Sequence, residues 1–180
     1  MNNREIEALI TQFPIYQYAF VETESIEFTE KVRTICKKEC SRYGKSWSCP
    51  PAVGTLDDCK NRCREYPQAL FFSTIADVPD YSDMDQLLAT RREHEKITSQ
   101  IEELLRKEGH KCYTLSSDSC ALCEKCTYPK RSCLHPEQMH PCIESHGIVI
   151  IPLVEANHMD YFMGEQMVIW FSLIFLQLAG

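Results

Sequence analysis

Glycine and proline are scarce in this chain, which holds 6 Gly and 9 Pro among 180 residues. A collagen-like or low-complexity chain would be rich in both, so those classes are excluded. Intrinsic disorder is excluded as well, because 44% of the residues are hydrophobic and can form a buried core. A chain of this length can bury such a core without disulfide or metal staples. We therefore expect a single compact domain over residues 1–180.

Basic residues are also in short supply, with 19 Lys and Arg against 26 Asp and Glu and a net charge of −7. The longest basic cluster is Lys37-Lys38, whereas phosphate contacts need clustered Lys and Arg, so no nucleic-acid partner is expected. The most apolar stretch, residues 167–178, is shorter than the ~20 residues of a membrane-spanning helix. No secretory signal is visible at the N-terminus. These features predict a cytoplasmic protein with no membrane partner.

Cysteine, in contrast, is abundant, with 11 residues. Thiols stay reduced in the cytoplasm, where disulfides are rare, and an odd number of cysteines does not make a closed disulfide framework. A domain of this size has no need of cross-links for stability. Clustered cysteines in this setting indicate metal or redox sites.

The hydrophobic periodicity predicts an α/β fold in which a mixed sheet is covered by helices. A strand over 68–76, a long helix over 83–108 and a strand over 111–117 form a βαβ unit, which favours parallel pairing of the two strands. The segment 148–154 is compatible with helix or strand. Strands are also predicted over 15–21 and 167–177, shorter helices over 27–39 and 56–66, a helix near Pro141, and two Cys-rich loops at about 36–63 and 120–142.

The stronger cysteine motif is Cys120-x2-Cys123-x2-Cys126-x6-Cys133. Three thiols at a spacing of three residues let one loop wrap a compact centre, as at the start of the bacterial ferredoxin motif. A structural zinc site also needs four ligands, although it commonly uses two separated Cys pairs. The third possibility is that these are free cysteines without a metal. The spacing favours a [4Fe–4S] iron–sulfur cluster, with zinc as the alternative cofactor.

A second group of thiols precedes this motif. Cys36 and Cys40 are one helical turn apart, Cys49 is followed by proline, and Cys59 lies on the next predicted helix. These four residues are predicted to hold a second cluster or a zinc ion. Cys63 and Cys142 are equally compatible with ligation and with a passive role, and Cys112 is expected to pack in the core.

Motifs of other chemistries are missing. The chain has no G-x-G-x-x-G, P-loop, G-x-S-x-G or H-E-x-x-H sequence, so no catalytic residue and no reaction can be named. The histidines His135, His140 and His146 flank the second cysteine motif. Each could donate a hydrogen bond to a cluster sulfur and tune its potential.

Four sequence blocks follow one another along the chain: YGKSWSCPPAVG, CALCEKCTYPKRSC, PCIESHGI and IWFSLIFL. Taken in this order, they resemble an uncharacterised family of predicted metal-binding proteins, the domain of unknown function 2284. The resemblance runs over roughly residues 33 to 177. It implies a Cys-rich metal-binding protein, with ligand positions that match seven of the eight candidate cysteines, all but Cys59, and it supplies no reaction.

The sequence thus predicts a protein that binds one or two [4Fe–4S] clusters for electron transfer or redox sensing, together with a redox partner protein. Two alternatives stay open. One is a structural zinc-binding interaction module, and the other is an iron–sulfur enzyme with an open iron site and an unknown substrate. The candidate ligands are Cys36, Cys40, Cys49, Cys59, Cys120, Cys123, Cys126 and Cys133.

Overall fold

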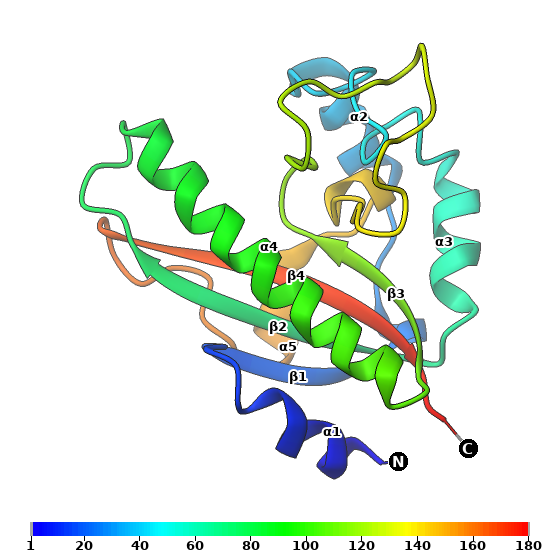
Figure 1. Ribbon diagram of the computed structural model, residues 1–180, viewed down its shortest axis with the longest axis vertical. Coiled ribbons are helices and arrows are strands. Elements are labelled where there is room, and N and C mark those ends of the chain that lie inside the picture. Colours follow the sequence, from blue (N-terminus) through cyan, green and yellow to red (C-terminus); the bar gives the residue numbers. More distant parts are fainter. Residues whose placement is uncertain (1, 180) are drawn as a thin grey trace.

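One four-stranded sheet forms the centre of residues 2–179, the part of the chain that the computed structural model describes. The spatial order β1-β2-β4-β3 places the last strand of the chain in the interior of the sheet (Figure 1). Every neighbouring pair is antiparallel. The strands are β1 Gln17–Glu22, β2 Gln68–Asp77, β3 Lys111–Ser116 and β4 Met167–Gln177.

Each of the α-helices within residues 3–107 begins at a side chain that caps it, whereas the one at 150–156 follows Val149, which has no capping group. Thr55 accepts a hydrogen bond from the amide of Asp58, whose carboxylate accepts one in return from the Thr55 amide, so α3 starts with a capping box. No helix among residues 2–179 has the length and apolar character to cross a membrane. The helices are α1 Asn3–Ile10, α2 Glu30–Glu39, α3 Leu56–Arg64, α4 Met84–Lys107 and α5 Ile150–Ala156, with short 3-10 turns η1 Thr23–Ser25 and η2 Glu144–His146.

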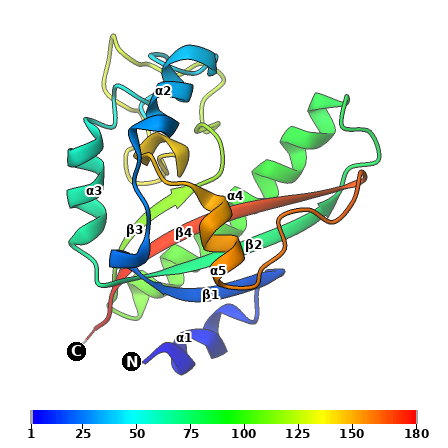
Figure 2. The same cartoon turned by 180° about the vertical axis from the view of Figure 1, so that it is seen from behind.

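The sheet is covered on both faces. Side chains alternate along a strand, so Leu70 and Phe72 of β2 point toward α1 and α4, and Phe71 points toward the opposite face. Figures 1 and 2 show α1 and α4 on one side of the sheet and α5 on the other. Ile101 of α4 and Leu153 of α5 are buried in the two resulting cores. This burial on both faces explains the nearly continuous apolar sequence of β4.

The predicted α/β class is confirmed, but one prediction about the sheet is wrong. β2 and β3 run in the same direction, as expected for a βαβ unit, yet β4 lies between them and pairs with both. The unit is therefore split, and the sheet is antiparallel rather than mixed. In the interior of the sheet, β4 buries its apolar side chains on both faces. The sequence prediction paired segments that are neighbours along the chain and did not consider this gain in burial.

Two further elements differ from the sequence prediction. Helix α1 was missed, although Asn2 caps it and Glu5 completes a capping box. The helix expected near Pro141 is only the short turn η2, and the ambiguous segment 148–154 forms α5. Pro152 is tolerated there because it occupies the first turn, where its missing amide hydrogen has no helical partner to lose.

The two Cys-rich segments, residues 40–55 and 117–143, contain no helix or strand and lie together beyond the end of β3 (Figure 1). Polar contacts join them. The Trp47 indole donates a hydrogen bond to the carbonyl of Arg131 at 3.1 Å, and the Ser48 hydroxyl accepts one from the Cys120 amide at 2.9 Å. These contacts bring cysteines that are far apart in the sequence to one end of the sheet.

Candidate metal centre

Four cysteines of segment 117–143 border one small cavity. They are the four residues of the stronger motif, Cys120, Cys123, Cys126 and Cys133. Trp47 of the facing segment closes the cavity, and its ring packs edge-on against Tyr128 with centroids 4.9 Å apart. The four cysteines of this loop thus line one common space.

The donors around this cavity fit a thiolate-bound metal. Besides the four cysteines, His135 and Met139 line it, and no carboxylate among the described residues does. Soft sulfur ligands select iron–sulfur clusters and zinc over hard cations. The cavity is about 20 Å³, roughly the space of one water molecule, so a cluster would require the loop to open. No group of three or more His, Cys, Asp or Glu within residues 2–179 is arranged to hold a single ion.

Backbone amides support this loop. The His135 amide donates a hydrogen bond to the Cys133 sulfur at 3.4 Å. Amide donors of this kind stabilise a thiolate and raise the potential of a cluster bound to it. Burial raises the pKa of the Cys120 thiol, so a cation would have to displace its proton.

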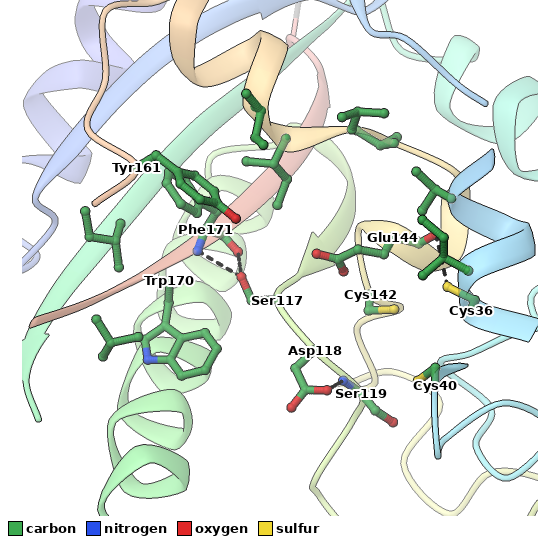
Figure 3. Close-up of a pocket in the computed structure, with 18 of the residues that line it drawn as sticks. Cys36, Cys40, Ser117, Asp118, Ser119, Cys142, Glu144, Tyr161, Trp170 and Phe171 are labelled. Atoms are coloured by element: carbon green, nitrogen blue, oxygen red, sulfur yellow. Dashed lines mark hydrogen bonds between the residues drawn. The ribbon is translucent and has the colours of Figure 1, made fainter. Parts of the chain in front are cut away.

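A second, larger cavity of about 780 Å³ lies between α2, segment 117–143 and β4 (Figure 3). Four thiols line it. Cys36 is in the last turn of α2, and Cys40 is its C-terminal cap. Cys49 follows in segment 40–55, and Cys142 lies two residues before η2. Three of the four residues predicted for the second centre are therefore brought together, with Cys142 in the place expected of Cys59.

Cys49 and Cys142 form a hydrogen-bonded pair of unequal acidity. The Cys142 thiol donates to the Cys49 sulfur, with further hydrogen bonds from Ser119 and Ser48, and together they lower the pKa of Cys49 to about 6. The same hydrogen bond, together with burial, raises the pKa of Cys142 well above its usual value. At neutral pH the pair holds one thiolate and one thiol. A thiolate is the form that binds metals and reacts with electrophiles.

Two neighbouring groups in this cavity hold their protons more strongly than usual. Burial raises the pKa of the Cys36 thiol, which donates to the carbonyl of Glu144 at 3.9 Å. Burial likewise raises the pKa of the Glu144 carboxyl group. Cys49 therefore loses its proton more readily than Cys36 or Cys142, the other two thiols of this cavity whose pKa is shifted.

The remaining cysteines lie elsewhere. Cys59 is buried on α3 and does not line the large cavity, because its sulfur is turned toward the Arg33 guanidinium at 3.7 Å and the Val53 carbonyl at 3.5 Å. Cys63 and Cys112 are buried in the two hydrophobic cores, and burial raises the pKa of Cys112 to about 12. Both behave as small apolar side chains.

Comparison with known proteins identifies the family. A family described as predicted metal-binding protein (DUF2284) matches residues 19–176. The chain belongs to this family. The match begins in β1 and ends in β4, so it spans both Cys-rich segments of this DUF2284 protein. No curated protein and no solved structure matches the chain. The resemblance inferred from the sequence blocks is thus confirmed.

The histidines of this DUF2284 protein have separate roles. His140 lies between two glutamates of α4 and bonds Glu102 at 2.9 Å, and His146 bonds the Tyr113 hydroxyl at 2.7 Å. Neither of these contacts involves a cysteine sulfur. Of the three histidines that flank the motif, His135 alone borders the small cavity among the described residues.

Cys142 is the residue that sequence reasoning did not place in a site. Its nearest cysteine along the chain is Cys133, but its partner is Cys49, which the fold brings near by pairing the Cys142 amide with the Ser48 carbonyl at 3.2 Å. Spacing gave no signal for this pairing, because Cys49 and Cys142 are far apart in the sequence. Because the chain belongs to the DUF2284 family, metal binding is its expected property. The cysteines that line the two cavities are the candidate donors.

Proposed function

We propose that this DUF2284 protein binds a [4Fe–4S] cluster through Cys120, Cys123, Cys126 and Cys133. The observation that carries the proposal is that all four thiols border one cavity, in a spacing typical of cluster-binding loops. The family description supports metal binding of some kind. The cluster would supply one-electron redox chemistry, and the protein would supply ligands, hydrogen bonds and shielding.

The surrounding residues suit electron transfer or redox sensing. The four thiols are partly exposed, and Trp47 and Tyr128 cover them on one side. A centre close to the surface can exchange electrons with a redox partner protein, and contacts such as the His135 amide would set its potential. We place this activity in the cytoplasm, where the thiols stay reduced.

A second centre is proposed at the sulfur-lined end of the large cavity. Cys36, Cys40 and Cys49 were predicted to share it with Cys59. The lining of the cavity favours Cys142 as the fourth donor instead, since Cys59 packs against Arg33. The thiolate of Cys49 provides a ligand that is already deprotonated at neutral pH.

Structural zinc binding is the second candidate function. The specific observation in its favour is the small volume of the cavity at Cys120–Cys133, which is closer to the size of one ion than to that of a cluster, although the donors within residues 2–179 would have to move to coordinate it. In that case the metal would stabilise segment 117–143 as an interaction module, and the protein would have no redox role.

Variants prepared without oxygen test the proposal. Cys123→Ser should lose the visible absorption of the cluster and its iron, because one of the four thiolate ligands is removed. The matched control is Cys112→Ser, since Cys112 is buried in the core and lines neither cavity. A colourless wild-type protein that contains stoichiometric zinc would overturn the iron–sulfur proposal and support the zinc candidate.

A further inference from the structure

The large cavity has two chemically different ends. One end carries the thiols described above together with the side chains of Asp118 and Glu144. The opposite end is apolar and aromatic. Figure 3 shows Glu144 and Asp118 between the cysteines on one side and the rings of Tyr161, Trp170 and Phe171 on the other. A molecule with one polar end and one apolar end would match this division.

The size of the cavity suits a small molecule. Its volume of about 780 Å³ falls within the roughly 300–1,000 Å³ typical of ligand pockets. Apolar side chains at its mouth are exposed, including Phe162 at 67% and Ile151 at 47%. Water contact with these groups is unfavourable and would be relieved by an apolar ligand body.

The charge of the lining selects the polar end of the ligand. No Lys, Arg or His of the described chain lines the cavity, whereas Asp118 and Glu144 do. Arg91 does not line the cavity; it is buried beside Asp118 at 3.8 Å and donates to the Ser117 carbonyl, so it is already engaged. A bound anion would find no counter-charge here. A bound cation would find the carboxyl groups of Asp118 and Glu144.

We propose that this cavity binds a small organic amine with an aryl or branched alkyl body. Its ammonium group would lie at Asp118 and Glu144, and its apolar body would contact Trp170, Phe171 and Tyr161. The position places a bound amine directly beside the thiols of Cys36 and Cys142. The inference goes beyond metal binding and does not depend on which metal the protein holds.

A matched pair of probes tests the proposal. We would titrate wild-type protein with 2-phenylethylamine and with 3-phenylpropionate, which are similar in size and opposite in charge, and measure binding by isothermal titration calorimetry. We expect the carboxylate to bind at least about tenfold more weakly than the amine. In a Trp47→Phe variant, Trp170 is the remaining tryptophan, and its fluorescence should saturate with the amine at the same concentration.

A pair of surface variants locates the site. Ile151→Lys places a cation at the cavity mouth, and Met84→Lys places one on α4, where Met84 is 56% exposed and does not line the cavity. We expect Ile151→Lys to weaken the amine about tenfold and to strengthen the carboxylate, and Met84→Lys to change neither. Equal affinity for both probes, no binding of either, or an unchanged amine affinity in Ile151→Lys would each overturn the proposal. Iron content is measured on the same samples, so that loss of amine binding can be distinguished from loss of the metal.

Discussion

At the scale of single residues, the cysteines of this chain differ in chemistry because their surroundings differ. Cys112 is packed among apolar side chains, and burial keeps it a neutral thiol. Cys49 is equally inaccessible to bulk water, with 3% of its surface exposed, yet hydrogen bonds hold it as a thiolate. Hydrogen-bond donors rather than depth of burial therefore decide which thiols are prepared to bind a metal.

The first prediction concerns the Cys142 hydrogen bond. In the metal-free protein, Cys142→Ala should raise the pKa of Cys49 from about 6 by roughly 1–2 units, because it removes the main donor to the thiolate. The measurement is the rate of Cys49 alkylation by iodoacetamide as a function of pH, read by mass spectrometry. Cys112→Ala serves as the control. A midpoint that stays near 6 in Cys142→Ala would show that Cys142 does not set the acidity of Cys49.

At the scale of elements, Gly147 fixes the junction between η2 and α5. Its φ of +74° is left-handed, and a Cβ there would approach Leu56 Cδ1 to 2.4 Å and the Thr29 carbonyl oxygen to 3.0 Å. The Thr29 amide also donates to the Gly147 carbonyl at 2.8 Å. This glycine therefore joins α2, α3 and the segment that carries Cys142.

The second prediction uses a glycine pair. Gly147→Ala should lower the free energy of unfolding by about 2–4 kcal/mol, from backbone strain plus overpacking. Gly44→Ala has a similar φ of +68° but meets no atom within 4 Å, so it should cost only about 1–2 kcal/mol. Urea unfolding of both variants measures the difference. Equal losses would mean that the contacts with Leu56 and Thr29 do not matter.

The third prediction concerns the contact of His140 with α4. The ring is buried between Glu95 and Glu102, and hydrogen bonds to these carboxylates, outweighing burial, raise its pKa to about 9. The same ring lowers the pKa of both glutamates. A histidine pKa raised above its unfolded value of about 6.5 contributes stability that is complete below that pH and is lost as pH rises through about 9.

The wild-type protein should therefore lose about 2–3 kcal/mol of unfolding free energy between pH 6.5 and pH 9 from this group. His140→Gln should be less stable at pH 6.5 and should show a nearly flat profile over the same range, because no proton is lost. Urea unfolding at several pH values is the measurement. Parallel profiles for the two proteins would contradict the assignment of a charged His140.

The elements that sequence patterns predicted are those whose cause is local. The periodicity of 84–107, the Thr55 cap and the apolar run of β4 each identify an element from neighbouring residues alone. Strand order could not be predicted in this way, because the insertion of β4 between β2 and β3 depends on how apolar surface is shared across the whole sheet. Helix α1 was missed because it has few residues and its buried residues, Ile6 and Ile10, form only one turn of pattern.

In the candidate site, too, the sequence predicted what has a local cause and missed what depends on the fold. The motif from Cys120 to Cys133 lies within one loop, so its spacing alone predicted a common centre. The association of Cys142 with Cys49 spans about half of the chain and depends on the contact between segments 40–55 and 117–143. The separation of Cys59 depends on the orientation of α3 against Arg33, which no spacing rule contains.

At the scale of the whole molecule, the sheet and the Cys-rich end are stabilised by different means. The sheet has two hydrophobic cores, whereas segments 40–55 and 117–143 have neither helix nor strand. A metal bound to thiols of these segments would supply the stabilisation that they do not obtain from a core. The Cys-rich end should therefore be the part that depends most on the metal.

The fourth prediction follows from this division. Removal of the metal under anaerobic conditions should lower the thermal unfolding temperature by several degrees, because bound metal stabilises the folded state. Limited proteolysis should then cut first within 117–143, while the sheet remains resistant. Cys112→Ser loaded with metal is the control. Identical melting curves and cleavage patterns before and after removal would show that metal binding is not coupled to folding.

The most direct measurement is a count of iron, zinc and acid-labile sulfide per chain in protein purified without oxygen. The account predicts at least four iron and four sulfide ions per chain. The iron and sulfide of one [4Fe–4S] cluster should be lost in Cys123→Ser and retained in Cys112→Ser. Zinc without sulfide, or a protein with neither metal, would contradict the central claim that the Cys120–Cys133 loop holds an iron–sulfur cluster.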